Sequence, residues 1–224
     1  MTLTVVMTDI HGCYDQMMQL MDDVHNFNDD PKKFIFLGDY VDRGPDSAKV
    51  VQYLIDHPEF ICLKGNHEDM MINQYDFWLP NGGNTTLNSY KNVSIEKYNE
   101  HIEWMKNLPY YYEDEHRIYV HAGLDPRVPL EEQNAQSMLW IRDTFLLSNH
   151  DFGKLVIHGH TPRRQVDIQP NRINLDTGGV FGNKFTAAFF KEGQRDLYKY
   201  TDVYGYSKHV LPEDIIKNHP DKDQ

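Results

Sequence analysis

The stretch "FLGDYVDRGPDS", Phe36–Ser47, crowds acidic and basic side chains between turn-forming glycine and proline residues. It follows directly on a short apolar run, residues 34–37, that is typical of a buried strand. In α/β proteins ligands bind at the loops that follow the carboxyl ends of strands. The stretch therefore predicts a strand, turn and helix with a functional site at the turn.

The same pattern recurs along the chain, because four other short apolar runs also end in polar residues. These runs are residues 3–7, 60–63, 118–120 and 155–157. The polar residues that follow them are Asp9, His11, Asn66, His67, His121, His158 and His160. Strands that end at the same edge of a sheet bring their loops together. We therefore expect an α/β fold whose site is assembled from several distant loops.

Composition indicates one globular domain, residues 1–224, since no linker-like segment divides the chain. No apolar run approaches the ~20 residues that a membrane-spanning helix needs, which predicts a soluble protein without a membrane partner. Residues 1–7 lack the basic start and long apolar stretch of a secretory signal, so we expect a cytoplasmic protein. The formal net charge of −12 argues against nucleic acid as a partner. The sequence leaves the oligomeric state open.

Two further regions have a recognisable pattern. Residues 69–115 are rich in Met, Tyr, Trp and Asn and predict a helical insertion beside the site. Residues 172–176, 185–190 and 197–200 predict strands joined by glycine-containing turns. The tail, residues 212–224, is expected to be flexible.

The donors at the strand ends suit two divalent cations, which bind carboxylate, imidazole and amide oxygen ligands. The candidate ligands are Asp9, His11, Asp39, Asn66, His121 and His160. Asp39 is the expected bridge, because its strand should lie between the strands that precede Asp9 and Asn66. One ion is then assigned Asp9, His11 and Asp39. The other is assigned Asp39, Asn66, His121 and His160.

Such a pair of ions is suited to hydrolysing phosphate esters. Two cations ~3.5–4 Å apart acidify a shared water molecule and hold the phosphoryl oxygens during attack. His67 is the expected general acid for the leaving group, and Asp42 is expected to keep it protonated. Arg43 and Arg142, with Asn66, are the expected phosphate-binding residues, since a guanidinium matches phosphate oxygens in pairs.

Five sequence blocks carry a family resemblance across roughly residues 5–185. They are "TDIHG" from Thr8, "GDYVDRG" from Gly38, "GNHE" from Gly65, "HAGLDP" from His121 and "HGHT" from His158. In order and spacing these blocks resemble the phosphoprotein phosphatase family of calcineurin-like metallophosphoesterases. The resemblance implies a four-layer α/β/β/α sandwich with mixed sheets. It also implies a binuclear centre, with manganese expected and iron or zinc as alternatives, and direct attack by a hydroxide that bridges the two ions.

Two substrate classes are open within this family. "GDYVDRG" and "GNHED" look like protein phosphatases, and "WLPNGG" from Trp78 is similar to their bacterial and bacteriophage branch. The resemblance thus implies a phosphoprotein or phosphopeptide substrate carrying phosphoserine, phosphothreonine or phosphotyrosine. The alternative is a diadenosine tetraphosphate hydrolase. Asp42 and Glu68 favour the protein phosphatase, because the hydrolases commonly differ there. A metal-binding scaffold without activity is the third hypothesis, which the presence of Asp42 and His67 disfavours.

Some neighbouring residues keep two interpretations. His158 fits packing or a supporting hydrogen bond better than a direct role in the site. Asp176 is equally suited to orienting a metal ligand and to closing a simple turn. The run Tyr110–Tyr112 is more typical of an aromatic strand than of a platform that stacks on a substrate ring.

Overall fold

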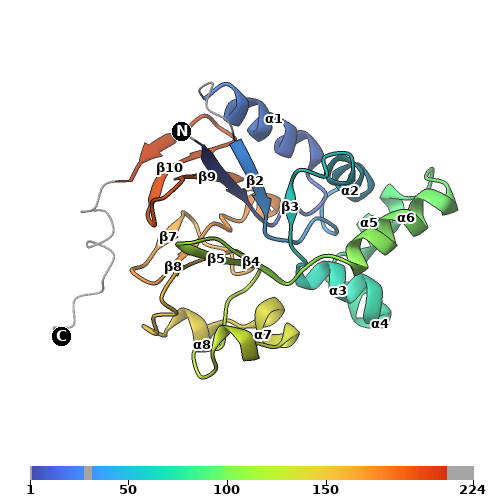
Figure 1. The fold of residues 1–224 in the computed structure, drawn as a ribbon. Coiled ribbons are helices and arrows are strands. Elements are labelled where there is room, and N and C mark those ends of the chain that lie inside the picture. Colours follow the sequence, from blue (N-terminus) through green and yellow to red (C-terminus); the bar gives the residue numbers. More distant parts are fainter. Residues whose placement is uncertain (1, 28–31, 211–224) are drawn as a thin grey trace.

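The computed structural model describes residues 2–27 and 32–210 (Figure 1). The predicted flexible tail, residues 212–224, lies outside the described residues. Within them, two β-sheets pack face to face and helices cover the outer face of each (Figure 1). This arrangement confirms the predicted four-layer α/β/β/α sandwich.

The first sheet has six strands and contains the three strands at the N-terminal end of the chain. Its order is β11 (Ser207–His209), β10 (Leu197–Asp202), β9 (Thr186–Lys191), β1 (Leu3–Met7), β2 (Lys32–Phe36) and β3 (Ile61–Cys62). Strands β1, β2 and β3 are parallel, whereas β9, β10 and β11 pair antiparallel. Strand β2 therefore lies between β1 and β3, as expected for a bridging residue that follows β2.

The second sheet has five strands and is also mixed. Its order is β4 (Tyr111–Glu113), β5 (Arg117–Val120), β6 (Leu155–His158), β8 (Arg172–Asn174) and β7 (Asp167–Ile168). Strands β5, β6 and β8 are parallel, and β4 and β7 run antiparallel at the two edges. The loops after β5 and β6, which carry His121 and His160, thus leave a different sheet from the loops after β1, β2 and β3.

Three apolar clusters account for the four layers. The cluster between the sheets joins residues such as Val6 and Ile35 of the first sheet to Ile157 and Ile173 of the second. A larger cluster packs the outer face of the first sheet against helices. A smaller one packs the second sheet against α7 (Ala135–Trp140) and α8 (Asp143–Leu146). The successive residues Val5 and Val6 of β1 enter different clusters, because successive side chains of a strand point to opposite faces.

The helices fall into three groups along the chain. Helices α1 (Tyr14–His25) and α2 (Ser47–Ile55) follow β1 and β2. Between β3 and β4 lie α3 (Asn66–Asn73), α4 (Tyr75–Trp78), η1 (Leu79–Asn81), α5 (Gly83–Ser89) and α6 (Ile95–Lys106). The remaining short helices are η2 (Leu130–Glu132), α7 (Ala135–Trp140), α8 (Asp143–Leu146) and η3 (Gly179–Phe181).

The segment predicted as a helical insertion, residues 69–115, ends in a strand rather than a helix. Tyr112 of β4 pairs with Tyr119 of β5, and its hydroxyl group accepts a hydrogen bond of 2.6 Å from Lys33 Nζ. Tyr111 and Tyr112 therefore sit in an edge strand, as the aromatic-strand interpretation expects, and Tyr110 directly precedes it. In the part of the chain described, no helix combines the length and apolar character needed to cross a membrane.

We predict that Leu155→Ala lowers the free energy of unfolding by about 2–5 kcal/mol, because it leaves a cavity in the core between the two sheets. Leu155 in β6 is 3% exposed. The matched control is Leu147→Ala, at a leucine that is 82% exposed, where a change within about 0.5 kcal/mol is expected. Urea denaturation of both variants measures the difference. Equal losses would contradict the assignment of Leu155 to the core.

Candidate active site

Loops from both sheets meet around a cavity of about 250 Å³. Seven of the predicted site residues line it: His11, Asp39, Arg43, Asn66, His67, Arg142 and His160. Asp9, Asp42 and His121 are buried and touch these lining residues. The structure thus brings together every residue that the sequence analysis assigned to the site. Trp140 and Phe181 also line the cavity, although the sequence analysis did not predict either.

Three donor atoms converge on one side of the cavity. The oxygen Oδ1 of Asn66 lies 2.9 Å from His121 Nε2 and 2.9 Å from His160 Nδ1, and these two nitrogens are 3.2 Å apart. Asp39 Oδ1 is 3.5 Å from His121 Nε2. Asp39, His121 and His160 form a group whose ligand atoms all lie within 4.8 Å of one another. The set fits a divalent cation with nitrogen and oxygen ligands.

The other oxygen of Asp39 faces a second set of donors. Asp39 Oδ2 lies 3.5 Å from His11 Nε2 and 3.9 Å from His67 Nε2. These three residues make a second group whose ligand atoms lie within 4.8 Å of one another. Because Asp39 belongs to both groups and turns one oxygen to each, its carboxylate has the geometry of a bridge between two cations.

Asp9 stands beside these groups, held by its own hydrogen bonds. Its Oδ2 accepts bonds from Thr8 Oγ1 at 2.6 Å and from the backbone N–H of His160 at 3.0 Å. Asp9 thereby ties the end of β1 in the first sheet to the loop after β6 in the second. The sequence analysis predicted it as a ligand, and that role remains a prediction.

Backbone carbonyl groups orient two of the candidate histidine ligands. Nδ1 of His11 lies 2.8 Å from the carbonyl oxygen of Val41, and Nδ1 of His121 lies 3.0 Å from that of Leu37. A ring nitrogen that donates to a carbonyl leaves the opposite nitrogen free to bind a metal. Burial lowers the pKa of both imidazoles, which favours the neutral form that a metal requires. These residues therefore fit a bound cation.

His67 and Asp42 form a buried pair. Nδ1 of His67 lies 2.6 Å from Asp42 Oδ2, so its Nε2 is the nitrogen free for the cavity. Burial, with the positive charge of Arg43 nearby, lowers the pKa of His67, whereas burial raises the pKa of Asp42 to about 6. The net direction for the pKa of His67 is thus downward, set first by burial. The expected role of Asp42 in keeping His67 protonated stays a prediction.

The two predicted arginines reach the cavity from opposite sheets. The guanidinium group of Arg43 contacts His11 Nε2 and lies 5.1 Å from the centre of the Phe181 ring. Arg142 Nε donates to His160 Nε2 at 3.2 Å. This bond places the hydrogen of neutral His160 at Nδ1, facing Asn66 Oδ1. A cation at Nδ1 would require the other tautomer, with the hydrogen at Nε2.

The backbone is strained at these residues. Among the described residues, the non-glycine positions with positive φ are Asp9 (53°), His11 (46°), Asp39 (58°), Asp42 (76°), Arg43 (67°) and His160 (66°). Each such residue costs about 1–3 kcal/mol and persists only where its surroundings hold it in place. All six were predicted as site residues. The strain is a signal for function that only the three-dimensional structure reveals.

Glu68 has a structural role that the sequence analysis missed. Its carboxylate is fully buried and accepts backbone N–H groups of Gly65 and Asp39 at 2.9 Å and of Tyr40 at 2.7 Å. Burial raises its pKa to about 7. Glu68 thus joins the start of α3 to the loop that carries Asp39. Its place three residues after the N-cap Gly65 matches the glutamate half of a capping box, which was the available sequence signal.

Asp42 is held by partners that the sequence analysis did not name. Trp78 Nε1 donates to its two oxygens at 2.8 and 2.9 Å, and Thr86 Oγ1 donates to Oδ1 at 2.7 Å. Trp78 belongs to α4 and Thr86 to α5. The helices after β3 therefore support the His67–Asp42 pair.

Two glycines allow the loops to approach this closely. A Cβ atom on Gly65 would lie 2.2 Å from Asp39 Oδ1, and one on Gly159 would lie 2.2 Å from Asp9 Oδ2. Both distances are far below van der Waals contact. A larger residue at Gly65 would displace the Asp39 carboxylate, and one at Gly159 would displace the Asp9 carboxylate.

His158 does not line the cavity, whereas Asp176 does. His158 is buried against Phe145, with ring centres 5.1 Å apart, and does not line the cavity, which agrees with the packing interpretation. Asp176 lines the cavity, and its Oδ1 accepts the N–H of Gly178 at 2.9 Å. It therefore closes a turn while its carboxylate forms part of the wall.

The fold and this cluster define a metallophosphoesterase. Residues 2–204 match the sequence model of the calcineurin-like phosphoesterases, and the chain belongs to that family. As a member, it is a metal-dependent phosphoesterase.

The relatives indicate a narrower class. The chain is 28% identical to the asymmetrical bis(5′-nucleosyl)-tetraphosphatase PrpE of Oceanobacillus iheyensis, over 84% of this chain and 88% of that one. Its identity to PrpE of Halalkalibacterium halodurans is 26%, over 84% and 89% of the two chains. The solved structure of a candidate diadenosine tetraphosphatase superposes with a TM-score of 0.67 at 22% identity, over 87% and 92%. The structure of a cold-active protein tyrosine phosphatase of a Shewanella species superposes with a TM-score of 0.69 at 16% identity, over 93% of this chain and 80% of that one.

The PrpE relatives, named as nucleotide hydrolases, contradict the phosphoprotein substrate expected from the sequence. That expectation came from the blocks "GDYVDRG", "GNHED" and "WLPNGG", with Asp42 and Glu68 as the residues that favoured a protein phosphatase over a nucleotide hydrolase. In the structure Asp42 binds Trp78 and Thr86, and Glu68 binds backbone N–H groups. Both residues thus support the architecture of the site, so they do not select between a protein and a nucleotide.

We predict that Glu68→Gln lowers the free energy of unfolding by about 1.5–3 kcal/mol, because the amide loses the charge and turns N–H donors toward backbone N–H groups. The matched control is Glu100→Gln on α6, where an exposed partner of Lys97 is neutralised. Its expected effect is below about 0.5 kcal/mol. Chemical denaturation measures both. If the two substitutions are equally mild, Glu68 does not hold the loop.

We predict that Asp39→Asn removes both metal ions rather than one, because each group depends on one oxygen of this carboxylate. Elemental analysis of the dialysed variant should find well under one ion per chain, against two for the parent. Circular dichroism checks that the variant is folded. A variant that keeps one full equivalent would show that Asp39 serves a single ion.

Proposed function

We propose that the protein hydrolyses dinucleoside tetraphosphates asymmetrically, releasing a nucleoside triphosphate and a nucleoside monophosphate. The observation that carries the proposal is the pair of donor groups sharing Asp39 at the floor of a cavity that Arg43 and Arg142 also line. The similarity to PrpE proteins over 84% of the chain supports this substrate class over other phosphate compounds.

The proposed metal ligands are those expected from the sequence: Asp9, His11, Asp39, Asn66, His121 and His160. Two divalent ions, when bound, lower the pKa of water and offset the negative charge of the phosphoryl oxygens. Manganese is the proposed ion, because carboxylate and amide oxygens beside imidazoles suit it. The backbone bonds of His11 and His121 hold their Nε2 atoms toward Asp39 before any ion arrives.

Arg43 and Arg142 are proposed to bind the reacting phosphoryl group, with Asn66 beside them. A guanidinium donates two parallel hydrogen bonds to phosphate oxygens, so two arginines on opposite walls fix the phosphorus between them. The overall charge of −12 makes this local concentration of positive charge necessary for a polyanionic substrate. Attack by water forms one P–O bond and breaks a P–O–P bridge, whose oxygen leaves on the departing nucleotide.

His67 is proposed to protonate that departing oxygen through Nε2, while Asp42 holds Nδ1. The negative charge of a bound polyphosphate would favour the protonated ring, against the burial and the Arg43 charge that lower its pKa in the free site. The need for an acid depends on the leaving group. A phosphate leaving group, whose conjugate acid has a pKa of ~6, departs as an anion. An alkoxide requires a proton, because its conjugate acid is about as weak as water, whose pKa is ~15.7. The pair is therefore more important for alkyl esters than for phosphoanhydrides.

The direct test is incubation of the purified protein with diadenosine tetraphosphate and Mn²⁺ in ¹⁸O-labelled water. Anion-exchange chromatography should separate equal amounts of ATP and AMP, with the label in one of the two products. Two equivalents of ADP would mean symmetrical cleavage, and no turnover by a metal-loaded protein would reject the substrate class.

We predict that His67→Asn lowers kcat for glycerol 2-phosphate by about 10²–10⁴-fold, because its alkoxide leaving group depends on an acid. For diadenosine tetraphosphate, whose leaving group departs as an anion, kcat should fall by about tenfold or less. The control is the metal content, which should stay at the parent value. Loss of metal from this variant, or equal losses with both substrates, would mean that His67 is not the acid.

A further inference from the structure

We propose that Arg163 and Arg164 form a second phosphate-binding site, which holds the part of the polyphosphate chain that extends beyond the metal cavity. This inference rests on the proposed function. It adds a binding site to the cavity described above and assigns it a linear polyphosphate as ligand.

The position of the loop is the first argument. Thr161–Gln165 follows the candidate ligand His160, and Pro162 lines the metal cavity. Arg163 and Arg164 come next and line a neighbouring hollow of about 370 Å³, together with Gln165 and Asp167. A polyphosphate chain that leaves the cavity past Pro162 therefore meets these two arginines.

The loop backbone is fixed. The N–H of Arg163 donates to the carbonyl oxygen of Asp176 at 2.9 Å, and Asn183 Nδ2 donates to that of Arg164 at 3.1 Å. Asn174 Nδ2 donates to the carbonyl oxygen of Thr161 at 2.8 Å. The loop thus presents its side chains from a braced backbone, which reduces the ordering that binding requires.

The two guanidinium groups are available for a ligand. Both arginines are exposed, and within residues 2–27 and 32–210 neither has a carboxylate within 4 Å. The acidic residue in the hollow, Asp167, is already bound by Arg172 Nη1 at 2.8 Å and by Gln169 Nε2 at 2.7 Å. The charge of Arg163 also acts on Asp167, at longer range than the direct bonds of Gln169 and Arg172. In a protein of net charge −12, two adjacent exposed arginines are a local attraction for a polyanion.

The chemistry of the substrate also supports a second phosphate-binding site. Arg43 and Arg142 together match the oxygens of one phosphoryl group. A dinucleoside tetraphosphate carries three more phosphates, whose charges need other partners. Arg163 and Arg164 can bind them without contacting the reacting phosphorus, so they are binding residues and not catalytic ones.

The test measures inhibition of p-nitrophenyl phosphate hydrolysis by inorganic tripolyphosphate and by orthophosphate, with free Mn²⁺ held constant. In the variant Arg163→Ala/Arg164→Ala, the inhibition constant for tripolyphosphate should rise about tenfold, as expected for the loss of two exposed charge contacts. The constant for orthophosphate and the kcat for p-nitrophenyl phosphate should stay within twofold of the parent. The variant Arg163→Lys/Arg164→Lys keeps the charges. Its inhibition constant for tripolyphosphate should lie between those of the parent and of the alanine variant.

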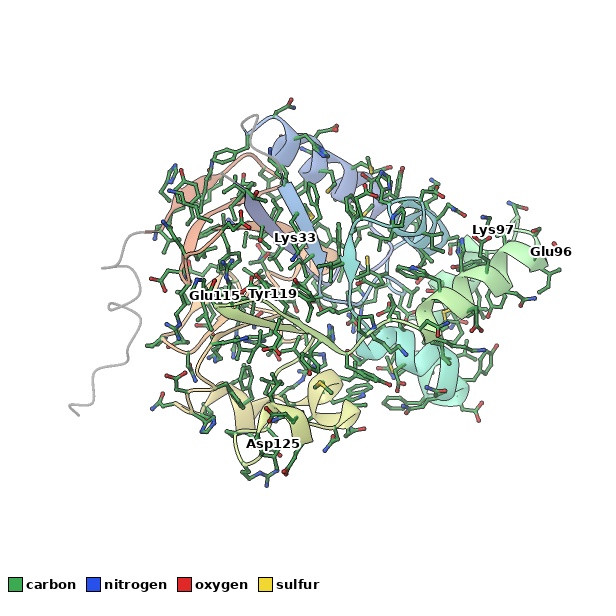
Figure 2. The ribbon with its side chains drawn as sticks, viewed as in Figure 1. Lys33, Glu96, Lys97, Glu115, Tyr119 and Asp125 are labelled. Carbon is green, nitrogen blue, oxygen red and sulfur yellow. The ribbon has the colours of Figure 1, made fainter. Side chains whose placement is uncertain are left out.

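The matched control removes two positive charges elsewhere. Lys97 and Lys106 lie on α6, at the side of the molecule away from β7 and β8 (Figures 1 and 2). Lys97→Ala/Lys106→Ala should leave the tripolyphosphate constant unchanged. An equal rise in this control, an equal rise for orthophosphate, or no rise in the arginine variant would overturn the proposal.

This measurement does not require the dinucleotide to be a substrate, so its failure is distinct from failure of the proposed function. With diadenosine tetraphosphate itself, the double alanine variant should raise KM about tenfold and change kcat by less than twofold. A loss in kcat with an unchanged KM would overturn the assignment of these arginines to binding.

Discussion

The carboxylate of Asp39 is the feature on which the rest of the site depends. It is 2% exposed, and burial, with the charges of Asp9 and Glu68 nearby, raises its pKa. One oxygen faces His121 at 3.5 Å and the other faces His11 at 3.5 Å. A buried negative charge is stable only when positive charge or hydrogen bonds compensate it. Two cations shared across this carboxylate would supply that compensation.

Hydrogen bonds and the strand order together hold Asp39 in this position. Its backbone N–H is bound by Glu68, its Oδ1 accepts the N–H of His67 at 3.0 Å, and its φ is 58°. Because β2 lies between β1 and β3, the loop after β2 reaches the donors of both neighbouring loops. The second sheet then contributes His121 and His160 from the opposite side. The strained turns are therefore stabilised by the packing of two sheets, which no single loop could provide.

The strand-end acids, amides and imidazoles predicted an α/β fold with a site at the sheet edge, and the family resemblance implied the four layers. The structure gathers the predicted residues around one cavity, whereas their ligand and acid roles stay predictions. The sequence did not predict the support behind them. Glu68 and Asp42 carry charge at motif positions, so they suggested substrate choice, whereas each binds groups from other elements. The direction of the His67 pKa also depends on burial, which a sequence does not display. Arg163 and Arg164 follow the last motif but gain meaning only from the adjoining cavity.

The central claim is that two cations share Asp39 in a cavity built for a phosphoanhydride. Anomalous diffraction from crystals grown with Mn²⁺ tests it most directly. The account predicts two peaks ~3.5–4 Å apart, one on each side of the Asp39 carboxylate, with His121 and His160 at one and His11 at the other. A single peak, or two peaks that do not share Asp39, would contradict it.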